Sequence, residues 1–224
     1  MGRTVIVTAL IAFLLSVAAL SAEAGRVEPS PPADPDPNAR YMFFMHGGYV
    51  EQHGLGRDYE YEAILRALAD KGFVVIGEAR GPTKFGAYAR GIADQVETLL
   101  DAGVPAGHIT VAGHSKGGFL ALMAASFIRR GKIKFGILAA CGLDGTPYRR
   151  NYLRFFERRA KKIKGRFLVM WEAGDVDTGH CDEALAAAGA PHRNLVLKVG
   201  GGHQLFYTPR AAWIDPLAAF ALSQ

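Results

Sequence analysis

The chain has 224 residues, of which 50% are hydrophobic and 21% are charged. This is the composition of a globular protein with one domain, or two at most, and it excludes disorder over most of the length. Two cysteines are too few for a disulfide-dense mini-protein. The net charge of +5 favours acidic partners only mildly, and no nucleic-acid partner is expected without a clustered basic patch and a recognisable binding module.

The first 24 residues have the pattern of a secretory signal peptide. Arg3 supplies a short positive region, residues 5–20 form an apolar run, and Ala22-Glu23-Ala24 fits a small-x-small cleavage site. We therefore expect cleavage after Ala24 and export to the periplasm or the medium, with no integral membrane domain left. The alternative is an uncleaved membrane anchor, although the run is short for a span of about 20 residues.

Residues 25–39 contain five of the eleven prolines of the chain. This density predicts an extended, poorly structured leader between the signal and the folded part. After the leader there is no further linker and no internal repeat. We therefore expect one domain over residues 40–224.

Within that domain, short apolar runs alternate with helical patterns. The runs that predict strands are 41–45, 73–76, 108–113, 134–140, 166–171 and 194–199, and the helical patterns are 59–71, 87–102, 116–130 and 211–221. Strands this apolar are typical of a parallel sheet that is buried on both faces. The alternation predicts a doubly wound α/β fold with a mainly parallel six-stranded sheet and helices on both faces.

A candidate nucleophile follows the third predicted strand. The segment Gly113-His114-Ser115-Lys116-Gly117 lies between that strand and a Leu- and Ala-rich helix. In this context G-x-S-x-G is the signature of a sharp turn that presents the serine hydroxyl at a helix N-terminus. Because a free serine is a weak nucleophile, Ser115 needs a base. We expect the side chain of Lys116 to be solvated rather than to act as that base.

The candidate base is His203, which follows the last predicted strand and three glycines. An imidazole titrates near neutrality, as a general base requires. A carboxylate that orients the imidazole is expected after the strand 166–171. Two aspartates, Asp175 and Asp177, compete for that role.

An oxyanion hole needs two N–H donors. We expect one from Lys116, the residue after the nucleophile, and the other from Gly48 or Tyr49 in the loop after the first predicted strand. Gly47 is a weaker candidate. His46 is expected to hydrogen-bond this loop rather than to transfer protons.

With these motifs the chain resembles the α/β-hydrolase superfamily over about residues 40–222. The resemblance rests on His46-Gly47-Gly48, Gly113–Gly117, Gly174–Asp177 and Gly202-His203. It implies an acyl-enzyme mechanism without metal or cofactor. Because the G-x-x-D spacing resembles the acid loop of the superfamily, we predict Asp177 as the acid, with Asp175 as the alternative. The usual first antiparallel strands and a large lid are missing.

Three further features are the two cysteines, a basic segment and a possible metal-binding sequence. In an exported protein Cys141 and Cys181 are expected either to form a disulfide or to remain as two buried thiols. Residues 149–166 hold nine Lys/Arg and one acid, which favours an amphipathic helix with a solvated cationic face over a rim that attracts anions. No metal site is expected at His180-Cys181-Asp182, because no second pair of ligands has metal spacing.

Together these features predict an exported serine hydrolase that cleaves a small-molecule or envelope-derived ester. In this hypothesis Ser115 attacks the carbonyl carbon, His203 takes the proton of the serine hydroxyl, and Asp177 or Asp175 orients His203. The alternatives are a serine peptidase, a thioesterase, or a binding protein that keeps the fold without catalysis.

Overall fold

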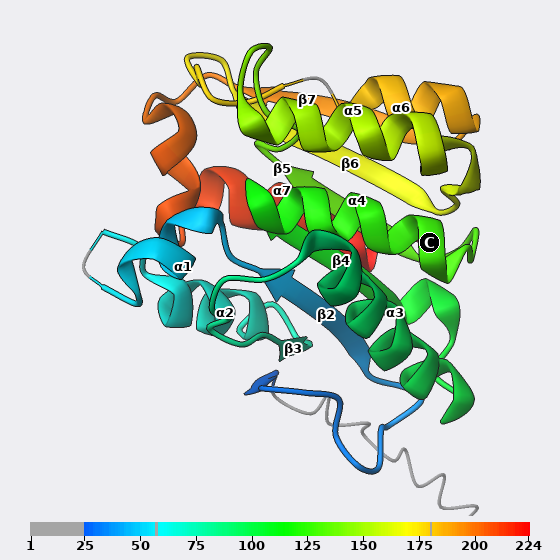
Figure 1. Ribbon diagram of the computed structural model, residues 1–224. Coiled ribbons are helices and arrows are strands. Elements are labelled where there is room, and N and C mark those ends of the chain that lie inside the picture. Colours follow the sequence, from blue (N-terminus) through cyan, green and yellow to red (C-terminus); the bar gives the residue numbers. More distant parts are fainter. Residues whose placement is uncertain (1–24, 57, 180) are drawn as a thin grey trace, which may run out of the picture.

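The computed structural model describes residues 25–56, 58–179 and 181–224. Seven parallel strands form one sheet in the order β1-β3-β2-β4-β5-β6-β7 (Figure 1). They are β1 (Arg26–Glu28), β2 (Arg40–Met45), β3 (Phe73–Ile76), β4 (Ile109–His114), β5 (Lys134–Leu138), β6 (Arg166–Glu172) and β7 (His192–Leu197). The parallel sheet confirms the predicted α/β class.

Helices cover both faces of the sheet. They are α1 (Gly48–His53), α2 (Tyr61–Ala69), α3 (Phe85–Asp101), α4 (Lys116–Ile128), α5 (Pro147–Arg159), α6 (Asp182–Ala188) and α7 (Ala211–Leu222), with 3-10 turns η1 (Ala106–His108), η2 (Ala160–Lys162) and η3 (Gly202–Tyr207). Residues of α3, α4, α5 and α6 share one hydrophobic core with the sheet, and residues of α1, α2 and α7 share the core on the opposite face.

The prediction of six strands was wrong, because the proline-rich segment contributes the edge strand β1. Arg26 and Val27 pair with Val74 and Val75 of β3. The strand is only three residues long and the side chain of Val27 is exposed. An edge strand held by backbone pairing has no apolar run to reveal it, so the segment 25–39 is not uniformly unstructured as expected.

The centre of the sheet positions the candidate nucleophile. All residues of β4 and β5 are buried, and nearly every residue of α4 is buried as well. Helix α4 packs against the sheet and lies between α3 and α5 on that face (Figure 1). A helix that is buried on all sides in this way is apolar around nearly its whole circumference. Ser115, between β4 and α4, therefore stands at the junction of two buried elements.

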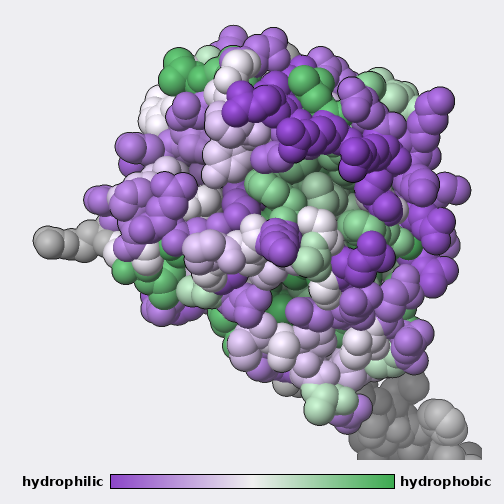
Figure 2. All heavy atoms as spheres, viewed as in Figure 1, coloured by the Kyte–Doolittle hydropathy of each residue, from purple (hydrophilic) through white to green (hydrophobic). Residues whose placement is uncertain are grey.

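The basic segment after β5 forms α5 and η2. Tyr152 and Phe155 are buried and Phe156 is half-buried, whereas Arg150, Arg154 and Arg158 are exposed. Figure 2 shows hydrophilic side chains gathered along this helix on the face that carries α3 and α4. The segment is an amphipathic helix, as the sequence favoured.

The predicted signal peptide, residues 1–24, lies outside the described residues. In the part of the chain that the structure describes, no helix combines the length and the apolar character that crossing a membrane requires.

Candidate active site

Ser115 occupies a strained turn at the carboxyl end of β4. Its φ of 54° and ψ of −116° are unusual for a residue with a side chain and cost about 1–3 kcal/mol. The N–H of Ser115 donates to the carbonyl of Leu138 at 2.8 Å, which ties the turn to the end of β5. Such strain at a strand-to-helix junction is typical of a serine held out for chemistry.

The glycines around Ser115 are required by close packing. A Cβ on Gly117 would lie 2.1 Å from the carbonyl oxygen of Met45, and a Cβ on Gly113 would lie 2.5 Å from the carbonyl carbon of Gly117. Neither position can hold a side chain unless the backbone moves. Strand β4, helix α4 and the end of β2 are therefore in close backbone contact next to Ser115.

His203, in η3 after β7, faces an aspartate of the loop after β6. Its Nδ1 lies 2.9 Å from Oδ2 of Asp175. The side chain of Asp175 is 0% exposed and that of His203 is 15% exposed. This contact leaves Nε2 of His203 as the nitrogen that is available to a substrate or to Ser115.

The structure pairs His203 with Asp175, the alternative acid, and not with the predicted Asp177. Oδ1 of Asp175 accepts hydrogen bonds from the N–H of Asp177 at 2.8 Å and of Thr178 at 3.2 Å. The turn closed by these bonds directs Asp175 inward, while Asp177 is exposed. The G-x-x-D spacing therefore selects the wrong aspartate as the partner of His203.

Ser115 and His203 line one cavity of about 250 Å³, together with Gly48, Tyr49 and Asp177. The remaining lining residues are Gln52, Phe119, Ala139, Ala140, Cys141, Gly142, Thr146, Tyr148 and Tyr207. Within the described residues the hydroxyl of Ser115 makes no hydrogen bond, and such contacts commonly tighten only when substrate binds.

The expected oxyanion donors surround Ser115. Gly48 and Tyr49 are the first residues of α1, and Lys116 is the first residue of α4. N–H groups in the first turn of a helix have no partner within that helix. The N–H of Gly47 instead donates to the hydroxyl oxygen of Tyr59 at 3.2 Å. This bond leaves Gly48, Tyr49 and Lys116 as the candidates.

His46 supports this loop, as expected. Its Nε2 accepts a hydrogen bond from the N–H of Arg80 at 2.9 Å, and its Nδ1 lies 2.8 Å from the carbonyl oxygen of Gly47. Burial lowers the pKa of His46 to about 4, with a further contribution from the charge of Arg80. The imidazole is therefore neutral at physiological pH and protonated on Nδ1, which donates to Gly47.

His114, directly before the nucleophile, is also held neutral. Its Nδ1 lies 3.2 Å from the hydroxyl of Tyr59, and its ring centroid lies 4.6 Å from that of His203. Burial lowers the pKa of His114 well below its usual range, and the neighbouring His203 lowers it further. A neutral His114 places no competing charge beside His203 when that residue takes up a proton.

A buried ion cluster lies next to residues 47–49, the candidate oxyanion loop, and the sequence analysis did not predict it. Oε1 of Glu51 accepts from Nε of Arg80 at 2.8 Å, and Oε2 accepts from Nζ of Lys116. The side chains of Glu51, Arg80 and Lys116 are 6%, 2% and 8% exposed. The expectation that the Lys116 side chain is solvated was therefore wrong, because Glu51 draws it under α1. The cluster joins α1 to α4, the two helices that begin with the candidate donors.

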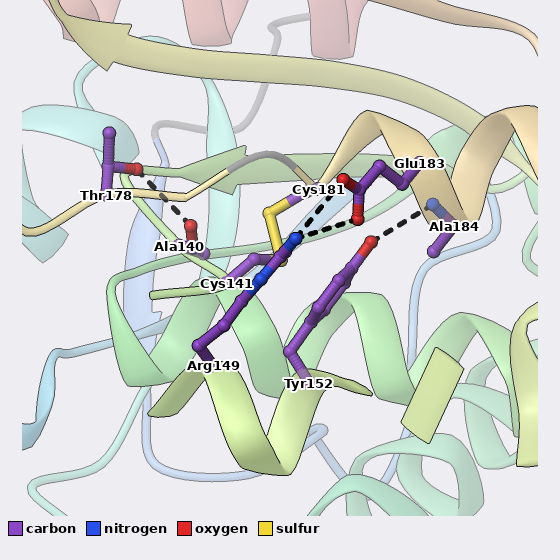
Figure 3. Close-up of a disulfide and its surroundings, with 8 residues drawn as sticks. All are labelled: Ala140, Cys141, Arg149, Tyr152, Thr178, Cys181, Glu183 and Ala184. Atoms are coloured by element: carbon purple, nitrogen blue, oxygen red, sulfur yellow. Dashed lines mark hydrogen bonds and ion pairs between the residues drawn. A yellow bond between two sulfur atoms is a disulfide. The ribbon is translucent and has the colours of Figure 1, made fainter. Parts of the chain in front are cut away.

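A disulfide joins Cys141, after β5, to Cys181, ahead of α6 (Figure 3). Of the two alternatives left open by the sequence, the structure has the disulfide. The carbonyl of Ala140 accepts from the N–H of Gly179 at 3.0 Å and from the hydroxyl of Thr178 at 3.3 Å. The loop that carries Asp175 is thus fastened to the loop after β5, which forms one wall of the cavity.

Glu172 links the loop after β6, which carries Asp175, to the loop after β7, which leads to His203. Its Oε2 accepts from the N–H of Gly174 at 2.7 Å and its Oε1 from the N–H of Gly200 at 3.1 Å. Both loops that carry the Asp175–His203 pair are therefore braced by one buried carboxylate.

Asp175, Asp177 and His203 bring potential metal-ligand atoms within 4.8 Å of one another. Both oxygens of Asp175 already accept hydrogen bonds or face Nδ1 of His203. These contacts match an acid that orients a histidine better than a metal site.

The sequence matches no family model and no curated protein, but solved structures share its fold. An esterase from Rhizomucor miehei superimposes with a TM-score of 0.58 at 18% identity, covering 86% of this chain and 77% of the esterase. An esterase from Thermogutta terrifontis gives 0.52 at 16% identity, covering 88% and 91%. Dipeptidyl peptidase 4 from Porphyromonas gingivalis gives 0.54 at 21% identity, covering 85% of this chain and only 32% of the peptidase. The chain has the α/β-hydrolase fold.

Proposed function

We propose that the chain is an exported serine hydrolase that cleaves carboxylic esters. The observation that carries the proposal is the shared cavity of Ser115 and His203, with His203 oriented by the buried Asp175. A serine on a strained turn, a histidine and a buried carboxylate together form the arrangement that makes a hydroxyl nucleophilic. Esterases among the structures with this fold support the choice of reaction.

The reaction follows from this geometry. Oγ of Ser115 bonds to the ester carbonyl carbon while its proton passes to Nε2 of His203, and Asp175 stabilises the resulting imidazolium. The carbonyl oxygen becomes an oxyanion, which the N–H groups of Lys116 and of Gly48 or Tyr49 stabilise. His203 then protonates the departing alcohol as the ester bond breaks, and a water molecule repeats the sequence on the acyl-enzyme.

The cavity favours small acyl groups. Its volume of about 250 Å³ lies below the usual range of pockets for drug-sized ligands, roughly 300–1,000 Å³. Phe119 and residues 139–142 line the same cavity as Ser115 and bound the room left for an acyl group. We therefore propose short-chain esters as substrates.

The test is hydrolysis of p-nitrophenyl esters of increasing acyl length by the mature protein and by Ser115→Ala. The proposal expects activity that is highest for short acyl groups and that falls at least about 10³-fold in the variant. If the protein is inert towards these esters, labelling by a fluorophosphonate identifies a hydrolase of other substrates, such as a peptidase or thioesterase. Absence of labelling would identify a binding protein.

Export is part of the proposal. It rests on the signal-like sequence of residues 1–24 and is supported by the disulfide between Cys141 and Cys181, since such bonds persist in oxidising compartments. Expression of the full chain in a bacterial host, followed by fractionation and mass measurement, tests it. The expected product is a periplasmic or secreted protein that begins at Gly25, whereas a full-length protein in the membrane fraction would indicate the uncleaved anchor.

A further inference from the structure

Tyr148, in the first turn of α5, contributes a side chain to the cavity from outside the Ser–His–Asp arrangement. It lines the cavity together with Ser115 and His203. The hydroxyl of Thr146 caps the helix by accepting from the N–H of Arg149 at 3.1 Å, and the Tyr148 ring meets Phe85 edge to face at 6.4 Å. The capped helix end and the ring contact position the side chain at the mouth of the cavity.

The Tyr148 hydroxyl lies over the oxyanion loop. A Cβ added to Gly48 would be only 2.6 Å from the Tyr148 oxygen and 3.8 Å from Cβ of Lys116. The hydroxyl therefore occupies the space left by the missing side chain of Gly48, a space that Lys116 also borders. Gly48 and Lys116 are two of the three residues, with Tyr49, whose N–H groups are candidates to hold the substrate oxygen.

This hydroxyl is available to a substrate. Within residues 25–224, leaving aside positions 57 and 180, it has no hydrogen-bond partner, whereas the hydroxyl of neighbouring Tyr49 donates to Asp58 at 3.1 Å. Burial raises the pKa of Tyr148, and the nearby Glu51 carboxylate raises it further. The phenol keeps its proton at neutral pH and can act as a donor.

We propose that Tyr148 is a catalytic residue whose hydroxyl donates a third hydrogen bond to the oxyanion of the tetrahedral intermediate. Hydrogen bonds from a hydroxyl to a charged oxygen are short and about twice as strong as those between neutral groups. The bond would strengthen as negative charge develops, which is the condition for accelerating the reaction rather than only binding the substrate. This inference rests on the proposed ester hydrolysis at Ser115.

The test replaces the hydroxyl alone, with Tyr148→Phe. Loss of one oxyanion donor typically lowers kcat by about 10²- to 10³-fold, so we expect kcat on short-chain esters to fall roughly 100-fold or more, with KM changed less than about threefold. The matched control is Tyr152→Phe on the same helix. The Tyr152 hydroxyl lies outside the cavity, where it accepts from the N–H of Ala184, and kcat should stay within about twofold of wild type.

A second measurement separates a hydrogen bond from a purely structural effect. Thiono esters replace the carbonyl oxygen by sulfur, a weak hydrogen-bond acceptor. Wild type should therefore prefer the oxygen ester strongly, and Tyr148→Phe should reduce that preference by about the factor lost in kcat. A structural disturbance of the cavity would slow both substrates equally, and melting temperatures would report any loss of folding.

The outcomes distinguish the two proposals. An unchanged kcat in Tyr148→Phe, a change confined to KM, or an equal loss on oxygen and thiono esters would overturn the role of Tyr148 while leaving the proposed function intact. A wild-type protein that neither hydrolyses esters nor reacts with a fluorophosphonate would overturn the proposed function, and the role of Tyr148 with it.

Discussion

The two sides of the candidate active-site cavity are held by different interactions. On the oxyanion side, Glu51 bridges Arg80 and Lys116 and so joins α1 to the start of α4 without any covalent link. On the acid side, a disulfide and the hydrogen bonds to Ala140 fasten the loop after β6 to the loop after β5. One side therefore depends on charge and burial, and the other on the redox state of two cysteines.

This difference has a physical basis. The side chains of Glu51, Arg80 and Lys116 are buried, so their ion cluster is shielded from water and strong. The loop after β6 is more open, with Asp177 and Val176 exposed, and exposed ion pairs would add little. A covalent bond holds such a loop regardless of exposure. Each side can therefore be weakened independently of the other.

The largest effect is expected from the acid itself. Asp175→Asn removes the carboxylate that faces Nδ1 of His203, and in comparable sites this change lowers kcat by about 10⁴-fold. Asp177→Asn is the matched control, because the Asp177 side chain is exposed and only its N–H bonds to Asp175. Steady-state kinetics of both variants decides between the two aspartates. A larger loss in Asp177→Asn would restore the prediction made from the G-x-x-D spacing.

On the oxyanion side, Glu51→Gln should be the most damaging change. It leaves the buried charges of Arg80 and Lys116 without their carboxylate, and removal of one partner of a buried ion pair typically costs about 3–5 kcal/mol. Because α1 is then free to shift, kcat should fall as well. Urea unfolding measures the loss of stability.

The control is Glu62→Gln, which removes an exposed pair with Arg66 and should change stability by less than about 1 kcal/mol. Similar small effects in both variants would show that the cluster beneath α1 contributes no more than a surface pair.

On the acid side, the double variant Cys141→Ser, Cys181→Ser should be less damaging to catalysis. A disulfide across a sequence separation of 40 stabilises by about 2–4 kcal/mol, mainly by restricting the unfolded chain. We expect that loss in urea unfolding, with kcat lowered about tenfold or less, since the hydrogen bonds to Ala140 remain. Treatment of wild type with a reductant should reproduce the variant, and full activity with unchanged stability would contradict the role of the bond.

The sequence predicts the parts of the site that are encoded locally. Ser115 and His203 are each marked by glycines that follow an apolar strand, and both line the cavity. The choice between Asp175 and Asp177 could not be predicted, because it depends on which side chain closes the turn. A pattern of residue types two positions apart does not contain that information.

Contacts between distant segments also could not be predicted from the sequence. Glu51, Arg80 and Lys116 come from three different parts of the chain, and only the sheet order brings α1 and α4 together. Tyr148 was unassigned because only the folded chain brings its hydroxyl next to Gly48. The edge strand β1 was missed since backbone pairing leaves no hydrophobic pattern.

The smallest effect concerns the pH dependence of the oxyanion side. His46 has a pKa of about 4 in the folded protein against 6.5 for an unperturbed histidine, so the unfolded chain binds more protons between these values. Stability contributed by neutral His46 is therefore fully present above about pH 6.5 and is lost as the pH falls towards 4, by about 2 kcal/mol between pH 7 and pH 5. The Arg80 charge beside the ring adds to the shift.

His46→Gln keeps an acceptor for the N–H of Arg80 but cannot titrate, so the variant should be less stable at pH 7 and lose less stability on acidification. His114 remains in both proteins, and the difference between their urea-unfolding curves at pH 7 and pH 5 isolates His46. His53→Gln, which replaces an exposed histidine at the end of α1, should leave the pH dependence of stability unchanged. If wild type and His46→Gln lose equal stability on acidification, the acid sensitivity of the fold arises from other residues. The oxyanion side would then be held by the ion cluster of Glu51, Arg80 and Lys116 without a contribution from neutral His46.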